Sequence, residues 1–145
     1  MKKIVCIGMA SLLIAGMSVS QAFSDVSNKH WAKDSIDKMV EQGIISGHTD
    51  GTFKPSVNLK KIESIILLSK AAGVNKYEKA TEEFIEEYKD VLEKYKVSQG
   101  NKKFVAYLLG IKVLNETELE NYISTKNVNS AITREEIAVI LKRAF

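Results

Sequence analysis

The sequence predicts an all-α protein made of short helices packed into a small bundle. Three observations support this fold class. Apolar side chains recur three and four positions apart in several stretches, glycines follow most of those stretches, and the chain has a single proline. Five or six helices of this kind account for most of the chain beyond its first 22 residues.

The first 22 residues predict a cleaved secretory signal peptide. Lys2 and Lys3 form a basic start, an apolar run covers 4–17, and small residues follow at Ser20 and Ala22. The apolar run is shorter than the roughly 20 residues that a membrane-spanning helix needs. We therefore expect cleavage after Ala22, an exported protein, and no membrane segment in the mature chain.

Charge and cysteine content argue against several kinds of function. The formal net charge is +3, and loss of Lys2 and Lys3 with the leader removes two of these charges and leaves +1. Nucleic-acid binding, which needs clustered excess positive charge, is not expected. The single cysteine, Cys6, lies in the leader, so the mature chain has no thiol or disulfide chemistry. His30 and His48 are too few to predict a metal site.

Catalysis has no support in the sequence either. There is no cysteine nucleophile in the mature chain and no Gly-x-Ser-x-Gly elbow. The many Glu residues in 77–97 fall on the polar face of an amphipathic pattern, which is typical of a solvated surface. We predict that the protein is not an enzyme, with no catalytic residues and no cofactor.

The predicted helices follow from apolar stripes and their stop signals. In the first helix Ile36 and Met39 lie on one face, and Gly43 ends it. In the last helix we expect Ile140 and Leu141 to point inward. The predicted ranges are 29–42, 60–72, 77–97, 103–109, a short helix from about 115, and a last helix that opens at 133.

The loop after the first helix, Gly43–Pro55, has the sequence GIISGHTDGTFKP. A calcium loop with Asp50-Gly51 in its centre would need ligands at Ser46 and Val57, and valine has none. A phosphate-binding loop would lead directly into a helix, whereas Phe and Pro intervene here. The pattern instead favours a tight structural turn. The predicted structural residues of the loop are Gly43, Gly47, Asp50, Gly51, Phe53 and Pro55.

An internal repeat divides the mature chain into two units. Leu59–Glu63 aligns without gaps on Ile132–Glu136, and the alignment continues to the ends of both helices. Upstream, Gly43-Ile44 can be laid on Gly110-Ile111. Repeats of this kind bury their faces against one another rather than alone. We expect a first unit at 23–74 and a second at 75–145, the second containing a long helix.

The first unit carries four segments at fixed separations: Phe23-Ser24-Asp25-Val26, Trp31-Ala32, Gly43-Ile44-Ile45-Ser46-Gly47 and Asp50-Gly51-Thr52-Phe53-Lys54-Pro55. In order and spacing these segments resemble the motifs of the S-layer homology (SLH) domain. The second unit resembles a divergent SLH repeat, since Thr133-Arg134-Glu135-Glu136 matches the family's Thr-Arg-Ala-Glu but the loop motif and the tryptophan are missing. The resemblance implies a helical repeat fold, usually of three units with ligand grooves between neighbours.

This resemblance implies non-covalent binding to an anionic secondary cell-wall polysaccharide, often one capped by a pyruvylated sugar. Lys61 and Arg134 lie in the first turns of their helices, where free N–H groups and the helix dipole favour an anion. Asp25 either hydrogen-bonds a sugar hydroxyl or caps the first helix. Trp31 either covers an apolar sugar face or anchors the core of its unit. Thr133 and Glu136 are assigned to a capping box.

The implied location is secreted, at the cell wall or cell surface. The implied partner is the secondary cell-wall polysaccharide, and surface-layer proteins or self-association are the other partners considered. The alternative function is a secreted protein-interaction module of the surface layer in which the degraded second unit has lost glycan binding.

Overall fold

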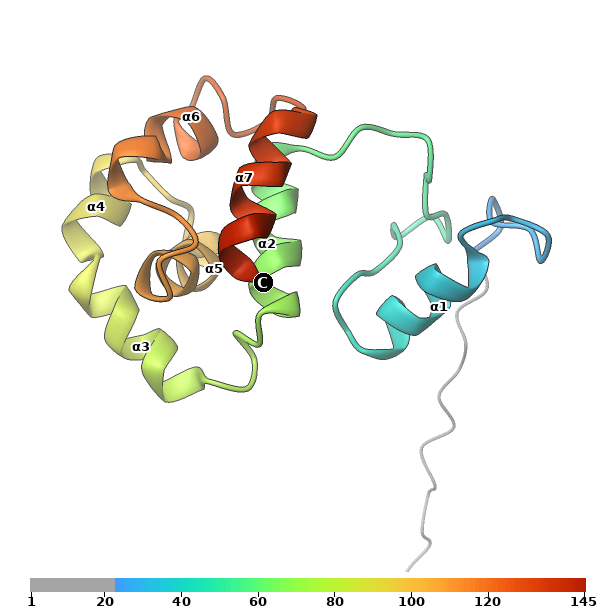
Figure 1. Cartoon of the computed structure of the whole chain (residues 1–145), viewed down its shortest axis with the longest axis horizontal. Helices are drawn as coiled ribbons and strands as arrows, with labels where there is room; N and C mark the ends of the chain where they lie inside the picture. Colours follow the sequence, from blue (N-terminus) through green and yellow to red (C-terminus); the bar gives the residue numbers. More distant parts are fainter. Residues whose placement is uncertain (1–22) are drawn as a thin grey trace, which may run out of the picture.

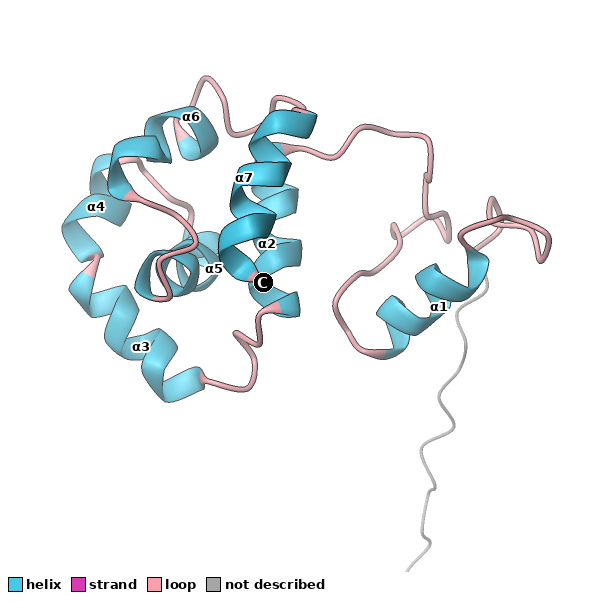
Figure 2. Cartoon of the chain, in the orientation of Figure 1, coloured by secondary structure: helices cyan, strands magenta, loops and turns pink. Residues whose placement is uncertain are grey.

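The structure, a computed structural model, describes residues 23–145, which are helical with no strands (Figures 1 and 2). The all-α prediction is confirmed. The predicted signal peptide at 1–22 lies outside the described residues. The elements in chain order are α1 (Lys33–Glu41), α2 (Lys61–Ala71), α3 (Glu78–Glu87), α4 (Lys89–Lys94), α5 (Gln99–Gly110), the 3-10 turn η1 (Glu116–Glu118), α6 (Leu119–Ile123) and α7 (Arg134–Ala144).

Buried apolar side chains form two separate clusters. We call the first the N-terminal cluster; its buried members are Phe23, Val26 and Ile36, with Ala32, Val40, Ile45 and Phe53 packed against them. The second is the core of a helical bundle that runs from α2 to α7. Figure 1 shows α1 and its loops standing apart from that bundle. The helix α2 therefore packs with the C-terminal part of the chain, although it lies in the predicted first unit.

Helix α5 forms the centre of the bundle, and α2, α3 and α4 all pack against it. Its apolar side chains are buried on nearly every face, as Val105 and Leu108 are each 0% exposed. Two side-chain hydrogen bonds fix α5 on α2. Ser69 Oγ donates to the carbonyl of Phe104 at 2.9 Å, and the Tyr107 hydroxyl donates to the carbonyl of Ala72 at 2.9 Å.

Two predicted helices differ from the observed ones. The stretch 77–97 is broken at Tyr88, where φ is −99° and ψ is 15°, so α3 and α4 can both turn toward α5. Tyr88 itself is buried at the break. The first helix begins at Lys33 rather than near 29, because the N–H of His30 donates to the carbonyl of Ser27 in a preceding turn.

The first turns of α2 and α7 are held together by a short backbone pairing. Lys60 and Ala131 form an isolated antiparallel bridge, and the N–H of Lys61 donates to the carbonyl of Ser130 at 2.9 Å. The predicted capping box of α7 is confirmed. Thr133 Oγ1 accepts from the N–H of Glu136 at 3.1 Å, and the Glu136 carboxylate accepts from the N–H of Thr133 at 2.9 Å.

The internal repeat is visible in the helix ends. Helices α2 and α7 have the same length of 11 residues and the same alignment as in the sequence. For α1 and α5 the structure gives a different register from the predicted one. Gly43 corresponds to Lys112, because both have positive φ, 69° and 63°. After each of them, two successive N–H groups donate to one carbonyl, which is that of Met39 after Gly43 and that of Leu108 after Lys112. The predicted match of Gly43 with Gly110 is therefore wrong by two residues.

Candidate functional site

The loop after α1 is a tight turn, as predicted. Gly43 and Gly51 have φ values of +69° and +79°, a conformation that glycine adopts without a steric penalty. The carboxylate of Asp50 accepts from both the hydroxyl and the N–H of Thr52. These bonds, with the ion pair to Lys54, lower the pKa of Asp50 from 3.8 to about 2. Asp50 therefore stays ionised and holds the turn.

Asp25 ties this loop to the start of the unit. Its two carboxylate oxygens accept from the N–H groups of Phe53 and Lys54 at 2.8 and 2.7 Å. The bond from Phe53 is the main reason why the pKa of Asp25 is lowered. Asp25 thus neither caps α1 nor offers an unoccupied carboxylate, and this structural role was not among its predicted ones. A carboxylate 28 residues upstream could not be assigned to a loop from sequence spacing alone.

Gly47 and Phe53 complete the same structural unit. The rings of Phe23 and Phe53 lie 5.3 Å apart between centroids. A Cβ on Gly47 would lie 2.0 Å from the Phe23 ring, so only glycine fits beside it. Pro55 follows Lys54, whose φ is 59°, and opens the turn toward α2. The Gly43–Pro55 loop thus helps to position the residues of the N-terminal cluster around α1.

Trp31 lies on the surface, not in the core. It is 92% exposed, and its ring stacks at 5.8 Å on the imidazole of His30. The core alternative for Trp31 is therefore wrong, because Phe23, Val26 and Ile36 fill that cluster without it. His30 Nδ1 also accepts from the N–H of Ala32 at 3.2 Å, which helps to fix the imidazole beneath the indole. A large, exposed indole is available to a ligand at this point.

Lys61 does not offer a free cation. Its side chain is only 7% exposed, and its ammonium group donates to the Glu136 carboxylate at 2.6 Å and to the backbone and side-chain oxygens of Asn121 at 2.9 and 3.1 Å. An ammonium has three N–H donors, so all of them are used inside the protein. In this arrangement the ammonium of Lys61 has no N–H left for the predicted glycan contact. The lysine instead joins the starts of α2 and α7.

Glu136 makes the stability of the bundle depend on pH. Burial raises its pKa, but hydrogen bonds from Lys61, the Thr133 backbone and Asn121 outweigh this effect and lower the pKa from 4.5 to about 2. A depressed folded-state pKa stabilises the fold above the ordinary value, and this stabilisation is lost as the pH falls from about 4.5 toward 2. We expect urea midpoints to drop in this window and to drop less steeply in a Glu136→Gln variant. Equal slopes would show that Glu136 is not the group responsible.

Arg134 remains at the surface. It is the first residue of α7 and is exposed, and no ion pair or side-chain hydrogen bond involves it within the described residues. Its guanidinium can pair with a carboxylate in a bidentate manner. The structure does not bring all four predicted ligands together. Lys61 and Arg134 are the first residues of α2 and α7, whose starts are paired. Asp25 and Trp31 precede α1, which stands apart from the bundle (Figure 1).

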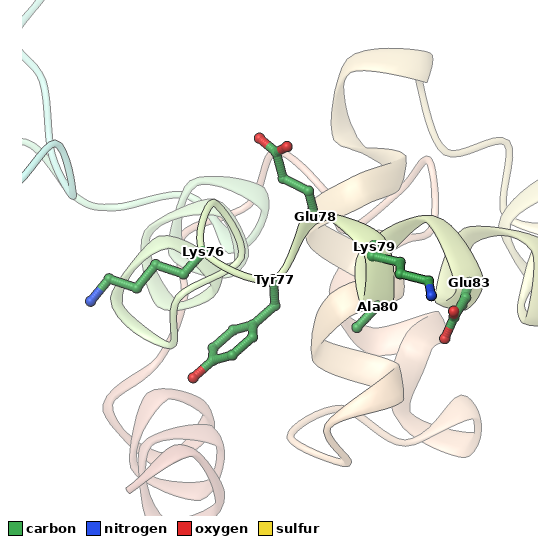
Figure 3. A pocket seen from close by; sticks show the side chains of 6 residues that line it. All are labelled: Lys76, Tyr77, Glu78, Lys79, Ala80 and Glu83. Carbon is green, nitrogen blue, oxygen red and sulfur yellow. The ribbon is translucent and has the colours of Figure 1, made fainter.

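Two shallow hollows are present on the bundle, and neither contains a predicted ligand. The first, of about 460 Å³, lies at the start of α3, and its side chains point in different directions rather than converging (Figure 3). The second, of about 230 Å³, is lined by Ile62 of α2, by Ser98 and Asn101 at the start of α5, and by parts of the 123–129 loop. The first has no arrangement suited to a specific ligand.

The described part of the chain has no helix with the length and apolar character that a bilayer crossing requires. Between residues 23 and 145, His, Cys, Asp and Glu side chains nowhere gather in threes as a metal site would require. Some charged side chains of this region pair with one another. An example is Arg143, which forms two bonds to the Glu118 carboxylate at 2.6 and 2.9 Å.

Comparison with known proteins links the first unit to bacterial surface proteins. The S-layer homology domain family matches residues 22–63. The outer membrane protein SlpA of Deinococcus radiodurans is 45% identical over 49 residues, which is 34% of this chain and 4% of that protein. An S-layer protein of Bacillus licheniformis is 30% identical over 88 residues, 57% of this chain and 10% of that protein. The cell surface glycoprotein 1 of Acetivibrio thermocellus is 40% identical over 58 residues, 40% of this chain and 2% of that protein.

The chain thus covers a tenth or less of each of these relatives. No solved structure matches it significantly. The family match begins at the predicted cleavage site and ends at the first turn of α2, and it includes the Asp25 contact, Trp31 and the whole Gly43–Pro55 loop. Residues 22–63 of the chain thus match the S-layer homology domain family.

Proposed function

We propose that the protein anchors itself to an anionic, pyruvylated-type secondary polysaccharide of the bacterial cell wall. The coarser part of this function, anchoring at the cell surface through an S-layer homology domain, rests on the family match and on relatives that are surface proteins. The same findings indicate a location at the cell wall or cell surface. The glycan and its acidic group are the finer part of the proposal.

The observation that carries the proposal is the exposure of Trp31 within the family unit. The Trp31 indole is 92% exposed, so few apolar groups of the protein cover it. Its orientation is held by stacking on His30. An apolar sugar face can cover such a ring and remove it from water. This geometry supports Trp31 as a carbohydrate platform.

Arg134 supplies the second element of the proposal. It lies at the start of an eleven-residue helix, where backbone N–H groups and the helix dipole add to the charge of the guanidinium. A carboxylate such as that of a pyruvylated sugar fits the guanidinium in a bidentate geometry. Since Lys61 is used internally, Arg134 is the cation that we assign to the glycan.

The test is binding to purified cell-wall sacculi, with and without extraction of the secondary polysaccharide. We expect retention on native sacculi and loss of retention on extracted ones. Trp31→Ala and Arg134→Ala should each weaken binding about ten-fold, which is the scale of one lost charge-assisted or aromatic contact. The matched controls are Tyr77→Ala, an aromatic residue that is 58% exposed, and Lys126→Ala, an exposed cation in the 123–129 loop. Equal retention on both kinds of sacculi would exclude this glycan as the ligand.

The second candidate function is a protein-interaction module of the surface layer without glycan binding. The internal pairing of Lys61 favours it, because one of the two predicted cations is no longer available. In this case native and extracted sacculi would behave alike, and the Trp31→Ala variant would bind as the unchanged chain does.

A further inference from the structure

The repeat leaves two helix faces without a partner. Positions on α2 that are buried in the bundle have exposed counterparts on α7, which has the same length and alignment. Ile65 and Leu68 are 0% and 2% exposed, whereas their counterparts Ala138 and Leu141 are exposed, Leu141 by 41%. Leu141 was predicted to point inward, and that prediction is wrong. Arg134, Ala138 and Leu141 of α7 and the following Phe145 are spaced three or four residues apart and form one stripe, which we call the α7 stripe.

The second open face lies on α1. Its counterpart in the repeat is α5, and with Gly43 matched to Lys112 the position of Met39 corresponds to Leu108 and that of Ile44 to Val113. Leu108 and Val113 are 0% and 1% exposed because α5 is the centre of the bundle. Met39 and Ile44 are half-buried and do not belong to the N-terminal cluster. This face of α1 therefore lacks the cover that its counterpart has.

The two open faces correspond to two faces that already pack on each other within the bundle, those of α5 and α2. In the bundle α5 packs on α2, through the Ser69–Phe104 and Ala72–Tyr107 hydrogen bonds. The counterpart of α5 is α1, and the counterpart of α2 is α7. The same interface, repeated, would place α1 on the α7 stripe.

We propose that α1 of one copy docks on the α7 stripe of a second copy, so that two chains exchange their α1 helices. In the structure α1 stands apart from the bundle of its own chain, as Figure 1 shows. On the two faces, Leu141 is 41% exposed and Met39 lies outside the N-terminal cluster. Reciprocal exchange covers the open face of each α1 and of each α7. No open face remains for a third chain, so the assembly is a closed dimer. The occupant of the α7 stripe is thus a second copy of this chain.

Charge agrees with this docking. Ile62 of α2 lines a hollow with Ser98 and Asn101 at the start of α5. The counterparts of Ile62 and Ser98 are Glu135 on α7 and Lys29 before α1, which have opposite charges. Docking therefore sets the Arg134 end of α7 beside the turn that carries Trp31 of the second copy. This last consequence, a glycan site shared by two chains, rests on the proposed function; the docking itself does not.

The docking is tested by light scattering coupled to size exclusion, without any glycan. We expect the purified chain to have twice the mass of one copy, and the dimer to be lost in Leu141→Glu and in Met39→Glu. The matched control is Val57→Glu, which makes the same kind of change at a residue that is 68% exposed and belongs to neither face. Circular dichroism shows whether each variant keeps its helices. A monomeric parent chain, or equal dissociation of the control, would overturn the proposal.

A cross-link separates exchange between copies from docking within one chain. Ser35 and Lys142 are the counterparts of Phe104 and Ser69, which are joined by a 2.9 Å bond in the bundle. A mixture of a Ser35→Cys chain and a Lys142→Cys chain should form a covalent dimer on oxidation. If the double variant instead closes within a single chain of monomer mass, α1 docks on its own α7 and the proposed exchange is wrong. Failure of sacculi binding with an intact dimer would reject only the glycan function.

Discussion

Replacing Lys61 with methionine should destabilise the protein by about 3 kcal/mol, because removal of one partner leaves a buried charge uncompensated. The side chains of Lys61 and Glu136 are 7% and 16% exposed, so water cannot replace the lost ammonium freely. Asn121 would remain as a side-chain partner of the carboxylate. The measurement is the free energy of unfolding in urea at neutral pH, where Glu136 is ionised.

The control for this prediction is the neighbouring residue. Lys60 is exposed, so Lys60→Met should change the stability by less than about 0.5 kcal/mol. The double variant Lys61→Met with Glu136→Gln removes both charges and should recover part of the loss, as expected for directly coupled residues. If the two lysine variants were equally stable, the pair would not be holding α2 and α7 together.

Gly110→Ala should destabilise the bundle by about 1–3 kcal/mol, the usual cost of overpacking a core. A Cβ at this position would lie 2.4 Å from two atoms of the Phe84 ring, which packs from α3 against the end of α5. Phe84 also contacts Tyr107, with ring centroids 6.4 Å apart, so it has little room to move. Thermal unfolding followed by circular dichroism measures the effect.

The same helix provides a matched control for Gly110. Gly100 also lies in α5, and a Cβ there meets nothing within 4 Å. Gly100→Ala should therefore leave the stability unchanged or raise it by up to about 1 kcal/mol, since alanine favours a helix more than glycine does. A loss of stability as large as that of Gly110→Ala would mean that the close approach of Phe84 is not the cause.

Local patterns predicted most of the fold. Helix α2 and the start of α7 lie within one or two residues of their predicted places, because an apolar stripe and a capping box are both local signals. The turn at Asp50-Gly51 was also predicted, because it depends on consecutive residues. The break at Tyr88 was missed because no glycine or proline marks it, and only the packing of α3 and α4 on α5 requires it.

The sequence did not predict the environments of two of the proposed ligands, Trp31 and Lys61. The predicted core role of Trp31 assumed a buried indole, whereas the indole is exposed. The predicted glycan role of Lys61 assumed an exposed ammonium, whereas the residue is buried. Burial of a single side chain depends on which other elements lie over it. The partner of Lys61 is 75 residues away in the chain, so spacing within one unit could not identify it.

By itself the sequence determined the fold class, the S-layer homology unit and its turn, because each depends on residues that are close together in the chain. Only the tertiary structure decided that α2 joins the C-terminal bundle, that Lys61 pairs with Glu136, and that the faces of α1 and α7 remain open. The physical reason is that burial and pairing arise from segments far apart in the sequence. An apolar or charged residue therefore has the same local pattern whether its face is covered or exposed.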